Sequence, residues 1–129
     1  ILSPKQQEWS VLLEFKKTDG SDNRIPPFSI ASVKVYTVPE GYRLLLKGAM
    51  CSMTDEHDMP LNAWCKIWLV ITTPGFLGDR YFIRSDALTF VPSQEIKEGH
   101  SLYVYLHNKS SEYAGATVNL IGVLESTRG

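Results

Sequence analysis

Apolar and polar residues alternate along most of this chain with the period of two that is typical of β-strands. The clearest case is residues 101–108, where aliphatic positions (Leu102, Val104 and Leu106) alternate with ring-bearing positions (Tyr103, Tyr105 and His107). One face of this segment can therefore bury in a core, while the other can meet water or a partner. A similar alternation of Trp9, Val11, Leu13 and Phe15 favours a strand over a helix at residues 8–17.

The whole pattern predicts about eight short strands. They are separated by turn signals such as the polar cluster at residues 18–23 and Pro39-Glu40-Gly41. We expect strands at residues 8–17, 31–38, 42–53, 63–73, 80–84, 87–91, 101–108 and 116–125, with loops at 54–62 and 74–79. Such a series predicts an all-β, two-sheet antiparallel β-sandwich, because two sheets that are each apolar on one face must stack.

Residues 42–53 should form the longest strand. Leu44, Leu46, Gly48 and Met50 are expected on one face. Glycine inside a strand often marks a bulge or a close approach of another chain segment. Gly48 is therefore the expected irregularity.

Composition limits the possible functions. The 129 residues predict a single domain spanning 1–129, with tails at 1–7 and 126–129 that are frayed or act as contact arms. The net charge of -1 and the absence of a basic run longer than Lys16-Lys17 disfavour nucleic-acid binding. Uninterrupted apolar runs such as residues 67–71 are too short to insert in a membrane.

Candidate chemistry is sparse. The acidic cluster at residues 55–58 lacks the ligand spacing of a calcium loop, so a solvated hairpin tip is expected there and no metal site or cofactor is predicted. No motif for nucleophilic catalysis is present, and we expect no catalytic residues and no enzyme.

The two cysteines leave two interpretations open. If residues 42–53 and 63–73 formed a simple hairpin, Cys51 and Cys65 would be cross-strand partners and a disulfide would be possible. The other interpretation, two buried thiols, is favoured because no secretion signal is visible.

Aromatic residues are the best candidates for an interface or a ligand site, because Trp and Tyr often anchor binding. Trp64 and Trp68 share one face of residues 63–73, and Tyr103 and Tyr105 share one face of residues 101–108. Residues 63–73 are apolar on both faces, which leaves open whether the tryptophans lie in the core or at an interface. The excess of apolar surface itself indicates packing against another chain.

Three segments resemble the jelly-roll structural proteins of bacteriophages and other viruses. They are a strand, Val-Pro-x-Gly, strand segment at residues 36–46 (YTVPEGYRLLL), a glycine turn and strand at 96–105 (IKEGHSLYVY), and a closing strand at 118–124 (VNLIGVL). Similar turns occur in cupins, tumour-necrosis-factor-like domains and carbohydrate-binding modules, but the Gly-x-His-x-His ligands of cupins are missing here. The resemblance therefore implies a jelly-roll-like sandwich.

In function, the resemblance implies a virion protein: a capsid, decoration or spike domain that acts through protein–protein contacts. Its expected partners are copies of itself, with a trimer favoured, and other capsid proteins. The alternative is a carbohydrate- or receptor-binding module in which the same aromatic residues stack on a host glycan.

Overall fold

The structure is a computed structural model that describes residues 2–61, 65–73, 76–83 and 87–128. These residues form ten strands and no helix. The strands are β1 (Gln6–Phe15), β2 (Lys17–Thr18), β3 (Ser21–Asp22), β4 (Ser29–Thr37), β5 (Tyr42–Thr54), β6 (Cys65–Thr73), β7 (Phe76–Ile83), β8 (Ala87–Ile96), β9 (Ser101–Asn108) and β10 (Gly115–Ser126).

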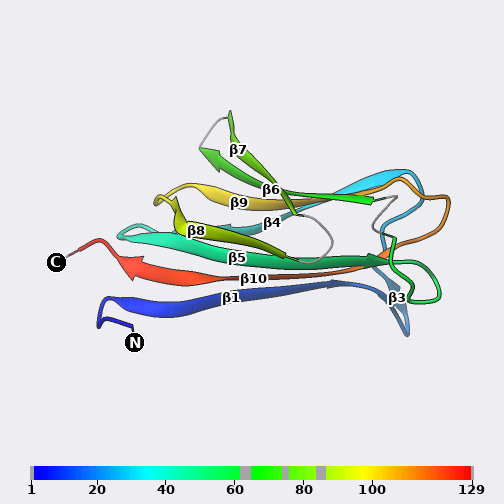
Figure 1. Cartoon of the computed structure of the whole chain (residues 1–129), viewed down its shortest axis with the longest axis horizontal. Coiled ribbons are helices and arrows are strands. Elements are labelled where there is room, and N and C mark those ends of the chain that lie inside the picture. Colours follow the sequence, from blue (N-terminus) through cyan, green and yellow to red (C-terminus); the bar gives the residue numbers. More distant parts are fainter. Residues whose placement is uncertain (1, 62–64, 74–75, 84–86, 129) are drawn as a thin grey trace.

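Two antiparallel four-stranded sheets stack face to face (Figure 1). One has the order β1-β10-β5-β8 and the other β4-β9-β6-β7, while β2 and β3 form a small hairpin. Among the eight long strands, only β6 and β7 are consecutive neighbours in one sheet, and every other connection crosses between the sheets. This winding is that of a jelly roll, so the expected jelly-roll-like sandwich is confirmed.

The core lies between the sheets and is built from the inward positions of every long inner strand. β9 shows the principle most clearly, because Leu102, Val104 and Leu106 are fully buried while the residues between them are partly exposed. From the facing sheet, β10 contributes Val118 and Leu120. The alternation read from the sequence is therefore the alternation that fills the core.

A bulge at Gly48 changes which residues of β5 face the core. The pairing of β5 with β8 shifts between Leu46 and Gly48, as expected for a strand glycine. Before the bulge Leu44 and Leu46 point inward, and after it the odd-numbered Ala49, Cys51 and Met53 do so. Met50, predicted to share the face of Leu44, is instead 49% exposed on the outer surface.

Residues 42–53 and 63–73 do not form the hairpin on which the disulfide interpretation depended. β5 pairs with β10 and β8, whereas β6 pairs with β7 and β9 in the opposite sheet. Cys51 lies opposite Val118, and Cys65 lies opposite Asn108. The cysteines are thus not cross-strand partners. The Cys65 side chain lies outside the described part, so the favoured interpretation, two buried thiols rather than a disulfide, stays a prediction.

Two boundaries in the middle of the chain also differ from expectation. β7 begins at Phe76, within the predicted loop at 74–79, and β8 continues to Ile96 rather than ending at residue 91. The extension of β8 passes through Pro92, which lacks a backbone N–H. An edge strand tolerates this, and β8 is an edge of its sheet.

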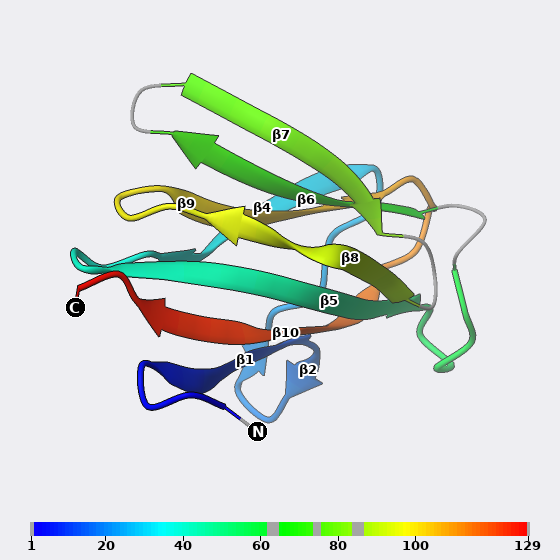
Figure 2. The same ribbon diagram turned by 60° about the vertical axis from the view of Figure 1, so that its left-hand side comes forward.

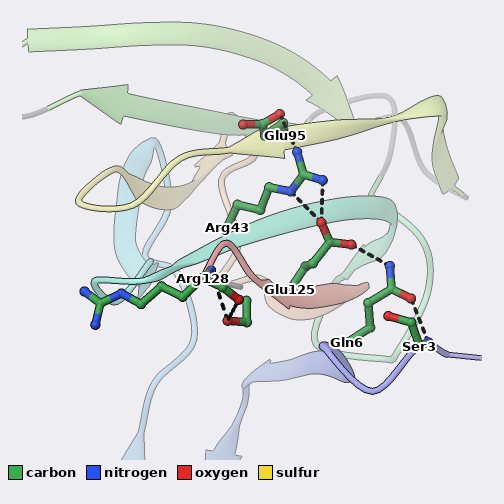
Figure 3. A network of polar contacts seen from close by, with 7 residues as sticks. Ser3, Gln6, Arg43, Glu95, Glu125 and Arg128 are labelled. Carbon is green, nitrogen blue, oxygen red and sulfur yellow. Dashed lines mark hydrogen bonds and ion pairs between the residues drawn. The ribbon is translucent and has the colours of Figure 1, made fainter.

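The predicted frayed tails are held in place at one end of the sandwich (Figure 3). The Gln6 amide donates to Glu125 at 2.6 Å, and Glu125 also accepts hydrogen bonds from the Arg43 guanidinium, which reaches Glu95 on its other side. The backbone N–H of Thr127 donates to the carbonyl of Gly41 at 2.9 Å. Residues from both ends of the chain are therefore bonded to the β5 region.

Asn108 forms hydrogen bonds to two of the segments that connect one sheet with the other. Its side chain is fully buried at the end of β9. The amide nitrogen donates to the carbonyls of Ile25 (3.1 Å), Pro26 (3.1 Å) and Glu112 (2.7 Å), and the amide oxygen accepts from the N–H and hydroxyl of Ser110. One side chain thus fixes both the entry to β4 and the loop from β9 to β10.

We predict that Asn108→Ala lowers the free energy of unfolding by about 2–4 kcal/mol, because buried carbonyl groups lose their donor. Denaturant titration measures this change. The matched control is Asn119→Ala on the outer face of β10, which should cost less than about 1 kcal/mol. Equal losses in the two variants would contradict the role assigned to Asn108.

The Glu125 contacts predict an effect of pH. Hydrogen bonds from Arg43, and then from Gln6, lower the pKa of Glu125 below its usual 4.5. A lowered folded-state pKa stabilises the fold above the unfolded pKa, and this contribution is lost as the pH falls through the folded value. The stability gap between the wild type and Glu125→Gln should therefore narrow as the pH falls below 4.5. Denaturation midpoints at several pH values measure the gap, and a constant gap would disprove the assignment.

Candidate functional site: an aromatic face

The outer surface of the β4-β9-β6-β7 sheet carries most of the candidate residues. We call Trp68, Tyr103, Tyr105 and His107 the aromatic face. Trp68 comes from β6 and the other three from β9, where they alternate with fully buried aliphatic residues. Because the aliphatic set points into the core, the ring-bearing set must point away from it.

Strand register brings these residues together from distant parts of the sequence. Tyr105 lies directly opposite Trp68 on β6 and Ser32 on β4. Tyr103 lies opposite Lys34 on β4. Directly opposed residues on one face have Cβ atoms about 4.5–5.5 Å apart, so their side chains interact.

The rings of the aromatic face form two contacts. The rings of Trp68 and His107 stack with centroids 6.0 Å apart and an angle of 26° between their planes. Those of Tyr103 and Tyr105 are tilted by 50° with centroids 6.4 Å apart. These separations lie within the range of favourable aromatic pairs, so the rings support one another's positions on the surface.

Apolar character continues beside the rings. Val70 is on the same side of β6 as Trp68 and lies opposite Tyr103, yet it is only 3% exposed. Ile30 of β4 lies opposite His107 and is 58% exposed. Phe28, two residues earlier in the chain, is 71% exposed. Phe28 has a φ of 54°, a backbone conformation that L-residues rarely adopt. Apolar side chains thus lie beside the rings on β6 and near the start of β4, whereas Ser32 and Lys34 of β4 lie opposite the two tyrosines.

The structure answers whether Trp68 lies in the core or on the surface, a question that the sequence left open. Trp68 points to the outer surface, because its neighbours Ile67 and Leu69 are in the core. The aromatic residues Trp68, Tyr103 and Tyr105 therefore share one surface, as an interface or ligand site requires. Trp64, the fourth candidate, lies outside the described residues. His107 was not a sequence-based candidate, because its stacking on Trp68 depends on the pairing of β6 with β9.

The acidic cluster at residues 55–58 is a turn held by its own backbone. The Asp55 carboxylate accepts hydrogen bonds from the N–H groups of His57 (2.8 Å) and Met59 (2.9 Å). These bonds, that from Met59 first, lower the pKa of Asp55. Glu56, His57 and Asp58 are exposed, in agreement with the expected hairpin tip. Among the described residues, no group of three or more His, Cys, Asp or Glu side chains is placed to hold a metal ion.

A depression of about 600 Å³ lies next to this turn. Its lining mixes opposite charges: acidic residues from the turn, such as Asp55 and Asp58, and the basic residues Lys16, Lys17 and Arg24. Arg24 is already paired with Asp22 at 2.8 Å. The mixture gives the depression no preference for one sign of charge.

No protein-family model matches this sequence, and a search of curated proteins finds no significant match. The described part of the chain also contains no helix long and apolar enough to cross a membrane. Arguments about function therefore rest on the fold and on the aromatic face.

Proposed function

We propose that this chain is a virion structural protein, a capsid, decoration or spike domain of a bacteriophage or other virus, that works through protein–protein contacts. The aromatic face on a jelly-roll sheet is the observation that carries the proposal. In an isolated sandwich the outer face of a sheet is expected to be polar. Here it presents the rings of Trp and Tyr, residue types that anchor protein interfaces.

The partners of the aromatic face are other copies of this chain, with a trimer favoured, or neighbouring shell proteins. The packing of the rings supports this assignment. Because Trp68 stacks on His107 and Tyr103 contacts Tyr105, the side chains lose little conformational freedom when a partner covers them. The role needs no catalytic residues and no cofactor.

We predict that Trp68→Ala weakens self-association of the chain by about 30-fold or more, the effect of losing a residue worth at least 2 kcal/mol at an interface. Size-exclusion chromatography with light scattering over a range of concentrations measures the association. Thr117→Ala, on the outer face of the other sheet, is the matched control and should leave it unchanged. A wild-type chain that remains monomeric, or a Trp68 variant that assembles normally, would contradict self-association through this face.

A carbohydrate-binding module is the second candidate, because partly exposed rings on a sheet also suit stacking on sugar rings. A glycan array distinguishes the two functions. Binding that is lost in both Trp68→Ala and Tyr105→Ala would favour the sugar-binding function. A blank array together with concentration-dependent assembly would favour the structural one.

A further inference from the structure

We propose that two copies of this chain pair through the open edge of β1, in antiparallel orientation, with Leu12 on the two-fold axis. This inference rests on the proposed self-assembly and adds a second contact to it. β1 is the edge of its sheet, and no described strand pairs with its outer side (Figure 2). Long exposed edge strands are templates for pairing with another chain.

The backbone of β1 offers its hydrogen bonds on known residues. The Ser126 N–H donates to the Lys5 carbonyl, so the backbone hydrogen-bonding groups of Lys5 point toward β10. Residues in an antiparallel pair alternate in direction, and the register of β1 with β10 has no shift. The odd-numbered residues of β1 therefore bond to β10. The even-numbered residues Glu8, Ser10, Leu12 and Glu14 direct their N–H and C=O groups to the open edge.

Both ends of this edge are closed by the chain itself. The Gln6 N–H already donates to the Ser3 carbonyl at 3.0 Å, as the N-terminal segment turns beside the start of β1 (Figure 3). After Phe15 the chain turns into the β2–β3 hairpin, where Asn23 bonds to the carbonyl of Lys16. The open stretch is therefore Glu8 to Phe15. A second copy can pair only around its middle.

Side-chain chemistry selects the register within that stretch. With Leu12 on the axis, Glu8 lies opposite Lys16 of the second copy, the first residue past the open stretch, whose side chain also pairs with Glu14 of its own chain at 2.8 Å. The two-fold repeats this attraction. With Val11 on the axis, Glu8 would instead lie opposite Glu14 of the second copy, and the two-fold would repeat a repulsion. Opposite charges across a strand pair are favourable and like charges are not.

The inner side of β1 also favours a neighbouring strand. Trp9, Leu13 and Phe15 pack against the core but are only partly buried, as Val11 is, because no described strand covers them at the edge. In the Leu12-centred register, Trp9 meets Phe15 of the second copy and Val11 meets Leu13. Leu12, 59% exposed, meets itself on the outer face. The contact would join the β1-β10-β5-β8 sheets of the two copies into one continuous sheet and complete the burial of both β1 strands.

Disulfide trapping tests the contact and its register. Leu12→Cys places two thiols on the axis, in a directly opposed pair whose Cα atoms are about 5.5 Å apart, which a disulfide can span. Ser10→Cys is the matched control, because the same register separates its two copies by about 14 Å. Each variant is oxidised beside the wild type, which reports any cross-linking through Cys51 or Cys65, and dimers are counted on non-reducing gels.

We expect Leu12→Cys to form covalent dimers at least tenfold faster than Ser10→Cys. Similar rates in the two variants would indicate that the two-fold axis passes through Val11. A faster rate for Ser10→Cys would indicate an axis through Ser10. Either result would overturn the proposed register. If neither exceeds the wild type while the wild type self-associates, the edge contact is wrong and the proposed function stands. If the wild type is monomeric by light scattering and neither variant cross-links, both are wrong.

Charge exchange gives a second readout that does not use cysteine. Glu8→Lys alone, or Lys16→Glu alone, should raise the dissociation constant about tenfold, since two symmetric pairs change from attraction to repulsion. The double variant should return within about threefold of the wild type, because the pairs are restored with their signs exchanged. Lys97→Glu, in the exposed turn after β8 at the opposite edge of the sheet, is the charge-matched control. Simple addition of the two single effects in the double variant would overturn the pairing of Glu8 with Lys16.

Discussion

The fold depends on hydrogen bonds that hold the chain where it passes from one sheet to the other, and Asn108 makes such bonds at two of these crossings. The jelly-roll winding places most consecutive strands in opposite sheets, so local hairpins cannot hold the structure together. Asn108 binds the backbone of Ile25 and Pro26 at the entry to β4 and that of Ser110 and Glu112 before β10. β9 and β10 are inner strands of the two sheets. The Asn108 amide therefore holds the loop that connects these inner strands of the two sheets.

Alternation along the sequence was enough to predict the strands that bury one regular face. β9 occupies the predicted residues without change, because its aliphatic and ring-bearing positions alternate without interruption. β5 shows where this reasoning stops. The glycine at 48 indicated an irregularity, but which residues follow it into the core depends on how β5 pairs with both neighbours. Met50 was assigned to the wrong face for that reason.

The candidate site was only partly predictable for a related physical reason. Tyr103 and Tyr105 could be recognised from one strand, whereas the direction of Trp68 could not, because its strand is apolar on both faces. The pairing of β6 with β9 decided it and brought His107 into the site. The hairpin considered for Cys51 and Cys65 does not form, because β5 and β6 lie in different sheets. Long-range pairing is the part of the fold that local pattern does not encode.

The proposed role in a virion shell requires more than one kind of contact, and the two contacts that we propose differ in physical nature. A two-fold contact alone closes on itself as a dimer, whereas a contact of different symmetry is needed to continue an assembly. The aromatic face can provide side-chain packing, which depends on shape, while the β1 edge can provide backbone hydrogen bonds, whose register depends on charge. They lie on different sheets, so the two contacts do not compete for the same residues. The jelly roll thus separates the two proposed contact surfaces, while one core supports both.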